Sequence, residues 1–165
     1  MLQRLMDRVF GGDGPAEASP ETRPIDLVLS LPRDLRASIG VLVPGSQQTA
    51  DVFARLIQGA RRSLKIFSPY VDPSFTALAR PARAPIQIVT TLREARMKSS
   101  PVLERLAAER PLAVRYLHEA RAKSQMFQLH AKMILADDAM AYVGSANFTD
   151  TSLHYNFELG LYVED

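Results

Sequence analysis

The chain has 165 residues, no cysteine, 47% hydrophobic and 23% charged residues, and a formal net charge of +2. This composition predicts one globular domain and excludes disulfides, thiolate nucleophiles and cysteine zinc sites. It also excludes a generally basic nucleic-acid-binding protein. Because no apolar run approaches the roughly 18 to 20 residues that span a bilayer, we expect a cytoplasmic protein without stable membrane insertion.

The first part of the chain differs in composition from the rest. Residues 1–22 are predicted to form a short amphipathic helix and a flexible linker, because apolar residues with helical spacing precede a stretch rich in Gly, Pro and small polar residues. The apolar positions are Leu2, Leu5, Met6, Val9 and Phe10. A helix this short is marginal alone, so we expect it to pack on its own domain or on a second subunit. Residues 23–165 are predicted to form the folded domain.

Strand and helix patterns alternate along this domain. Apolar and β-branched runs predict strands at residues 25–30, 64–68, 86–91, 112–117, 129–136, 141–144 and 157–163. Helices are expected after Thr49 as N-cap, at about 73–80, and from Pro101 to Arg110 with the proline as first helical residue. The alternation predicts an α/β fold with a mixed, largely parallel β-sheet flanked by helices.

Charge is unevenly distributed along the chain. Residues 93–123 hold eight basic and four acidic side chains, whereas residues 133–165 hold six acidic and no basic ones. Such an asymmetry marks either a phosphate-facing surface or solvated helix faces. Arg93, Arg121 and Lys123 are therefore candidates for substrate binding.

The residues with the clearest chemistry follow Leu129. His130 and Lys132 are two apart in a predicted strand, so their side chains would share one face. Ser145 and Asn147 are two apart beyond the next strand. If the two strands are neighbours, an imidazole, an ammonium group, a hydroxyl and an amide converge. All can donate hydrogen bonds, and this combination suits a phosphoryl group better than a carbonyl.

The spacing of these residues resembles the motif of the phospholipase D superfamily, which is His-x-Lys, four residues, Asp, six residues and Gly-Ser-x-Asn. The chain matches it completely, with His130, Lys132, Asp137, Gly144, Ser145 and Asn147. Asn156-x-Glu158 is similar to the downstream acidic element of the family. The run TADVFARLIQGARRSLKIFSPYVD is similar to its first helix and strand, so the resemblance covers residues 49–163.

The resemblance implies a phospholipase D-like fold and a two-step covalent mechanism. In the family, one motif histidine attacks phosphorus, while a second protonates the leaving oxygen and then activates water. His130 would be the nucleophile or the acid. Lys132, Ser145 and Asn147 would hold the non-bridging oxygens.

Four further residues receive roles from the same resemblance or from their position. Asp137 would shape the turn that fixes the motif, and Glu158 would orient an imidazole. Gly144, within the motif, and Tyr70, just beyond a predicted strand end, are candidates for bordering the substrate. The phospholipase D-like catalytic domain is expected to be residues 23–165.

The chain holds one copy of the motif, because neither His118 nor His154 has a lysine two residues on. The mechanism needs two motif histidines, so the resemblance implies a homodimer that shares one active site. His118 and His154 are expected to be structural or surface residues, and Asp138 is expected to be an ordinary turn residue.

Together with the donor-rich residues, the resemblance implies a metal-independent phosphodiesterase that uses no cofactor and hydrolyses DNA or RNA through a phosphohistidine intermediate. Short single-motif members of the family are mostly nucleases, and some act in anti-phage defence. Two alternatives stay open: a lipid-acting phospholipase or phosphatidyltransferase, and a non-catalytic phosphodiester-binding module. Lipid enzymes of the family generally carry two motifs in a longer chain.

Overall fold

The computed structural model describes residues 25–35, 43–92, 99–118, 121–122, 125–126 and 129–165. The strands are β1 (Ile25–Ser30), β2 (Gln47–Gln48), β3 (Leu64–Phe67), β4 (Ile86–Leu92), β5 (Leu112–His118), β6 (Arg121–Ala122), β7 (Gln125–Met126), β8 (Lys132–Ala136), β9 (Met140–Gly144) and β10 (Glu158–Glu164). The helices are α3 (Thr49–Gly59), α4 (Pro73–Ala79), α5 (Ser99–Glu109) and α6 (Asp150–His154), with a 3-10 turn η1 (Arg33–Leu35). The helix and linker expected in residues 1–22 lie outside the described residues, so the domain boundary after residue 22 stays a prediction.

Eight strands form one mixed sheet in the order β2-β1-β10-β9-β8-β3-β4-β5. β2 pairs in parallel with β1, and β4 pairs in parallel with both β3 and β5. The strands from β1 through β10, β9 and β8 to β3 pair antiparallel. The predicted α/β class with a mixed sheet is therefore confirmed. The sheet is less parallel than expected, because three of its seven strand pairings are parallel and four are antiparallel. The antiparallel centre holds the strands that carry the motif.

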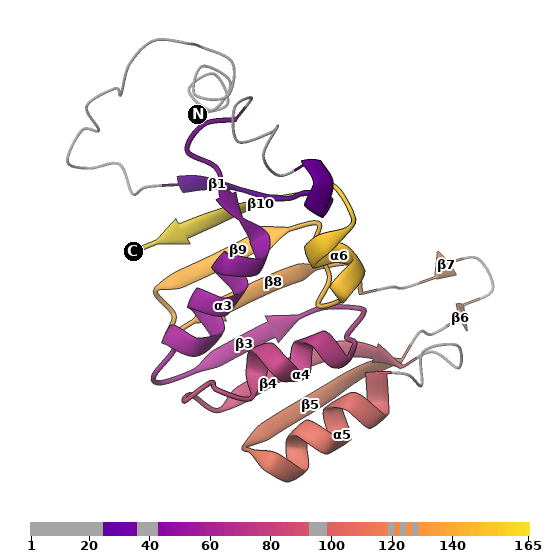
Figure 1. The fold of residues 1–165 in the computed structure, drawn as a ribbon. Coiled ribbons are helices and arrows are strands. Elements are labelled where there is room, and N and C mark those ends of the chain that lie inside the picture. The colour runs from indigo at the N-terminus through magenta and orange to yellow at the C-terminus, as the bar shows by residue number, and fades with distance from the viewer. Residues whose placement is uncertain (1–24, 36–42, 93–98, 119–120, 123–124, 127–128) are drawn as a thin grey trace.

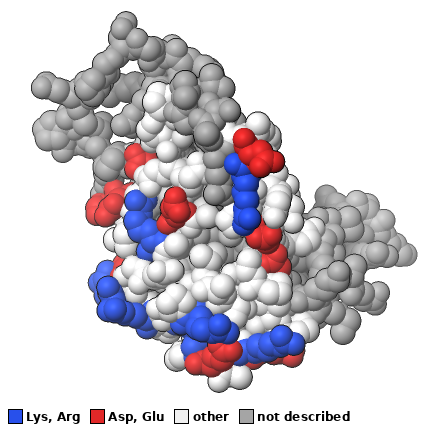
Figure 2. All heavy atoms as spheres, in the orientation of Figure 1, with Lys and Arg blue, Asp and Glu red and all other residues white. Residues whose placement is uncertain are grey.

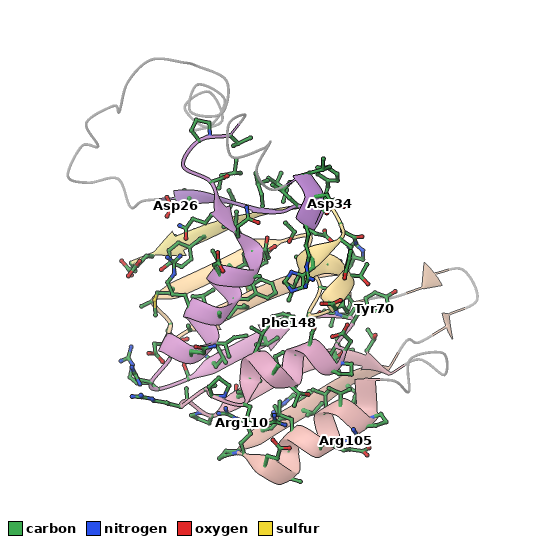
Figure 3. The ribbon with its side chains drawn as sticks, viewed as in Figure 1. Asp26, Asp34, Tyr70, Arg105, Arg110 and Phe148 are labelled. Atoms are coloured by element: carbon green, nitrogen blue, oxygen red, sulfur yellow. The ribbon has the colours of Figure 1, made fainter. Side chains whose placement is uncertain are left out.

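The described helices cover one face of the sheet, the face turned to the viewer in Figure 1. Phe53 of α3 stacks on Phe148 with ring centroids 4.6 Å apart, and Phe75 of α4 meets Phe148 edge-on at 5.3 Å. Figure 3 places Phe148 between the helices and the sheet. Burying such a ring contributes about 1.5 to 3 kcal/mol. Since Phe148 directly follows Asn147, the core anchors the motif loop.

Two predicted helix starts are wrong. Gln48 is the N-cap of α3, and Thr49 is its first helical residue. Gln48 already pairs with β1 as part of β2, so the chain passes directly from strand to helix. α5 begins at Ser99, which makes Pro101 its third residue instead of its first. Proline is tolerated there because the first-turn N–H groups have no acceptor within the helix.

One helix, α6, is absent from the expected elements. It has only five residues, too few for a 3.6-residue periodicity to show. Thr149 is its N-cap, and the Thr149 hydroxyl accepts a hydrogen bond from Ser152 N over 3.2 Å. That capping threonine is the signal by which the sequence could have revealed α6.

Candidate active site

All the motif residues except Asp137 come from segments at one end of the sheet, on the right in Figure 1. Lys132 begins β8, Gly144 ends β9 and Glu158 begins β10. Lys132 pairs with Gly144, and Gly144 pairs with Gly160 of β10. Antiparallel pairing therefore brings the start of one strand beside the end of its neighbour. We refer to this end as the motif end, and to the opposite end, at the turn after β8, as the turn end.

His130 lies before β8 and not within it. The strand expected over residues 129–136 begins only at Lys132, so its predicted start is wrong. The side-chain alternation of a strand therefore does not extend to His130, and the shared face of His130 and Lys132 stays a prediction. The reason is that β9 ends at Gly144, the partner of Lys132, and offers no further partner for His130. His130 is exposed, whereas Lys132 is only 5% exposed. The imidazole can thus be reached from solvent.

Lys132 is a buried cation beside the histidine backbone. Its Nζ donates a hydrogen bond to the main-chain oxygen of His130 over 2.8 Å. Burial lowers the pKa of Lys132, and the negative charge of Glu158 partly offsets this effect. Lys132 therefore loses its charge at a lower pH than a solvated lysine. An ammonium group has three donors, so its bond to His130 uses one of them.

Glu158 is fixed by two hydrogen bonds. Ser145 Oγ donates to Glu158 Oε2 over 2.6 Å, and Asn156 Nδ2 donates to Glu158 Oε1 over 3.2 Å. Ser145 Oγ also accepts from Leu159 N over 3.0 Å. The described contacts thus tie Glu158 to the motif serine. The expected role of Glu158 in orienting an imidazole stays a prediction.

Asn147, which is half-buried, presents its side-chain amide at the same end of the sheet. Its Oδ1 is buried, with no hydrogen-bond partner among the described residues. Its neighbour Phe148 donates from its backbone N to Ser68 Oγ over 3.4 Å and accepts from Asp72 N over 3.1 Å. An unpartnered buried polar atom costs about 1 to 3 kcal/mol. A donor supplied by a ligand or a second chain would therefore stabilise this site.

The loop after β3 is bonded to the motif loop. Asp72 caps α4 by accepting from Ser74 N over 2.8 Å, and its second oxygen accepts from Asp150 N over 2.8 Å. Ser68 Oγ donates to the main-chain oxygen of Tyr70 over 2.7 Å. Tyr70 is 40% exposed at the margin beside α6 in Figure 3. The structure thus brings Tyr70 to the motif end, where its contact with substrate stays a prediction.

The contributions of Ser68 and Asp72 were not foreseen. The signal lay in the run Ser68–Asp72, which ends a strand at Pro69 and supplies the N-cap of the next helix. The bonds of this run to the motif loop depend on a parallel bridge between Val71 and Phe148, 77 positions apart in the chain. Local patterns do not report a contact at that separation.

Asp137 lies at the turn end, away from the other motif residues. Its carboxylate accepts hydrogen bonds of 2.7 to 3.1 Å from the backbone N–H groups of Arg61, Arg62 and Ser63. These bonds, led by the one from Ser63, lower the pKa of Asp137. Its φ of 56° places it in the left-handed region. In this geometry Asp137 holds the β8–β9 turn against the chain that enters β3.

The other substrate-binding candidates cannot be placed with the site. Arg93 and Lys123 lie outside the described residues, as does the side chain of Arg121. On the helix-covered face, Figure 2 shows basic side chains interspersed with acidic ones. No helix in the described ranges is long and apolar enough to cross a membrane. Within those ranges, no group of three or more His, Asp or Glu residues could hold a metal ion.

The mixed sheet and the motif cluster at its end define a phospholipase D-like domain. Residues 53–165 match the family described as "Cardiolipin synthase, PLD-like domain". The chain therefore belongs to this family, within the phospholipase D superfamily that its motif resembles. No curated protein matches the chain in sequence.

Two solved structures are similar in fold. NucT from Helicobacter pylori has a TM-score of 0.60 and 18% identity, and the alignment covers 86% of this chain and 87% of that one. Nuc from Salmonella typhimurium, a phospholipase D family member, has a TM-score of 0.61 and 15% identity, with 87% and 84% covered. The likeness extends over most of both chains and confirms the predicted fold.

Proposed function

We propose that this protein is a metal-independent phosphodiesterase that hydrolyses DNA or RNA through a phosphohistidine at His130. The observation that carries the proposal is an exposed His130 bonded to the buried Lys132, with the motif serine Ser145 and the half-buried Asn147 at the same end of the sheet. Family membership supports the reaction class. The similarity in fold to NucT and Nuc, whose names are those of nucleases, supports nucleic acid as the substrate.

The proposed reaction has two displacements at phosphorus. In the first, a neutral nitrogen of His130 attacks, the new P–N bond replaces the P–O bond, and the partner subunit's His130 gives its proton to the leaving oxygen. In the second, the partner subunit's His130 takes a proton from water. That water attacks phosphorus, and the P–N electron pair returns to His130. Lys132, Ser145 and Asn147 are the groups we assign to the non-bridging oxygens.

The surface of the motif end supports a second protomer there. The exposed large hydrophobic residues among the described ones are Leu35, Tyr70, Leu117, Val143, Tyr155, Phe157 and Leu159. Leu117, Val143 and Leu159 are each one residue from the motif-side end of their strand, and the others lie in segments that follow or precede such an end. A second copy that brought its own histidine to this site would cover apolar side chains around it, which favours association.

A lipid substrate is the second candidate. The matching family is described as a cardiolipin synthase domain, and the same exposed apolar residues would suit contact with lipid chains. Such an enzyme would transfer or hydrolyse a phosphatidyl group with the same residues. One assay separates the two candidates.

That assay incubates the full chain with labelled single-stranded DNA, double-stranded DNA, RNA and phosphatidylcholine vesicles, all in EDTA. We expect hydrolysis of at least one nucleic acid. Activity on the lipid alone would replace the nuclease assignment with the lipid one. Activity that disappears with EDTA and returns with magnesium would contradict the mechanism, because Lys132 and two imidazoles then do not suffice.

Mixing of subunits tests the shared site. Wild-type chains are exchanged with an excess of His130→Ala chains, and hydrolysis is measured against the wild-type fraction. If one active site needs both histidines, every mixed dimer is inactive and activity falls as the square of the wild-type fraction. A linear fall would show that each chain works alone.

A further inference from the structure

Tyr142 lies directly beneath the motif loop. It is the middle residue of β9, its side chain is fully buried, and its ring meets Phe53 of α3 edge-on at 4.8 Å. Its register partner on β10 is Tyr162. The hydroxyl of Tyr142 extends along β9 toward the motif end, where Ala146 N donates to it over 3.4 Å. Ala146 stands between Ser145 and Asn147.

Two paired glycines leave room for this ring. A Cβ on Gly144 would lie 2.3 Å from the Tyr142 hydroxyl oxygen and 2.7 Å from backbone atoms of Leu159 and Gly160. A Cβ on Gly160 would lie 2.3 to 2.7 Å from three atoms, all of which belong to Tyr142. The side chain of Tyr142 therefore lies across the two glycines. The motif glycine is required in this chain partly because Tyr142 occupies the space of its side chain.

The hydroxyl of Tyr142 stays neutral over the working range of an enzyme. Burial raises the pKa of Tyr142 to about 12, and the negative charge of Glu158 acts in the same direction. A neutral hydroxyl accepts from Ala146 N without adding a negative charge beside an anionic substrate. Ala146 is fully buried, so water could not replace the Tyr142 hydroxyl as the acceptor of its N–H.

We propose that Tyr142 is a positioning residue that fixes the backbone of Ala146 and thereby sets the places of Ser145 and Asn147. This inference rests on the proposed function. A loosened turn would misplace both side chains, which touch the phosphoryl oxygens in the proposed reaction. Small displacements of positioned groups reduce turnover even when binding persists.

The test compares Tyr142→Phe with Tyr162→Phe. Both remove one hydroxyl from register partners under the same helices. However, the Tyr162 hydroxyl donates to Glu164 Oε2 over 2.7 Å, toward the turn end. We expect Tyr142→Phe to lower kcat about 3- to 10-fold, the loss of one hydrogen bond, with KM changed less than twofold. Tyr162→Phe should leave both constants within twofold of wild type.

Hydrogen exchange of the Ala146 amide gives a second measurement. We expect exchange about 5- to 10-fold faster in Tyr142→Phe and unchanged in Tyr162→Phe, in proportion to the lost bond. The proposal requires both the kcat change and the exchange change, so the absence of either overturns it. If the wild-type chain hydrolyses no phosphodiester, the proposed function fails, and the exchange measurement alone decides whether Tyr142 fixes the turn.

Gly160→Ala provides an independent variant should Tyr142→Phe fail to fold. The three atoms nearest to its added methyl all belong to Tyr142, so it should displace that ring and reproduce the faster exchange of Ala146. Combining it with Tyr142→Val should give a smaller loss of Tm than the sum of the two single changes. Additive losses would show that the ring does not fill this space, and would overturn the proposal.

Discussion

The two ends of the sheet differ in the hydrogen bonding and exposure of their side chains. At the turn end, Asp137 accepts three backbone N–H groups and Asp138 pairs with Lys65 over 2.6 Å. At the motif end, the Asn147 amide oxygen is buried without a described partner, and Phe157 is 62% exposed. At the turn end, the carboxylates are bonded within the chain. At the motif end, polar and apolar side chains are left available to a ligand or a second chain.

In the proposed mechanism, this difference separates a residue that stabilises the fold from a residue that reacts, within one motif. Asp137 belongs to the sequence motif as fully as His130 does, but the two lie at opposite ends of β8. Spacing alone cannot distinguish a residue that reacts from a residue that holds the strand in place. Buried polar atoms without a described partner occur at both ends, with Ser63 Oγ at the turn end and Asn147 Oδ1 at the motif end, whereas Phe157 and Tyr70 expose apolar rings at the motif end.

The largest effect is expected from His130→Ala, which removes the proposed nucleophile. Turnover should fall at least about 10³-fold, as it does when a nucleophile is deleted from a covalent mechanism, while Tm changes little because His130 is exposed. Steady-state hydrolysis and thermal unfolding measure the two effects. His154→Ala is the matched control, since His154 lies on α6 with Asp150 3.8 Å away. Near-normal turnover in His130→Ala would contradict the assignment of His130 as the nucleophile.

Lys132→Met should lower kcat about 10²-fold, the cost of one lost electrostatic donor. The variant keeps the apolar stem and removes a buried charge, so the free energy of unfolding should not decrease. Burial lowers the pKa of Lys132, so wild-type kcat should decline in alkaline solution at a lower pH than an ordinary lysine would cause. That decline should be absent from Lys132→Met. Equal pH profiles would argue that Lys132 does not act as a cation.

At the turn end, Asp137→Ala should reduce stability by about 1.5 to 3 kcal/mol, the value of hydrogen bonds to a charged group. Because its folded pKa is lowered, Asp137 stabilises the protein fully above the ordinary carboxyl pKa. This contribution is lost as the pH falls through the lowered value. Urea unfolding at pH 7 and pH 3 should thus show that the difference in free energy of unfolding between wild type and Asp137→Ala is smaller at pH 3. A loss of kcat in folded Asp137→Ala would place Asp137 in the chemistry instead.

The smallest effect is expected from Asp138→Asn. The Lys65–Asp138 pair is exposed, and such pairs contribute about 0 to 1 kcal/mol. Asn tolerates the left-handed backbone at this position, where φ is 60°. Tm should therefore fall by no more than a few degrees, and raised salt should remove the difference. A change as large as that of Asp137→Ala would show that the pair is strongly coupled to the turn.

The sequence was sufficient to predict the strands that carry the site. Fixed motif spacing and apolar runs located β8 and β9, whereas their pairing was only a condition of the sequence argument, which the structure fulfils. It did not predict that the strand excludes His130, because the end of a strand depends on where its neighbour stops. The hydrogen bond from Asp150 N to Asp72 and the position of Tyr142 against Gly144 and Gly160 were also not predicted, because they depend on tertiary packing.

The β8–β9 hairpin fixes the number of residues that can separate Lys132 from Gly144. Lys132 pairs with Gly144 and Ala136 with Met140, so the residues between Lys132 and Gly144 form the two strands of one hairpin and the turn that joins them. A single inserted residue would turn every following side chain to the other face. Lengthening preserves both register and orientation only when two residues enter each arm together. Natural variation and engineering at this hairpin are therefore limited to matched additions of four residues, each of which moves the site about 7 Å from the turn.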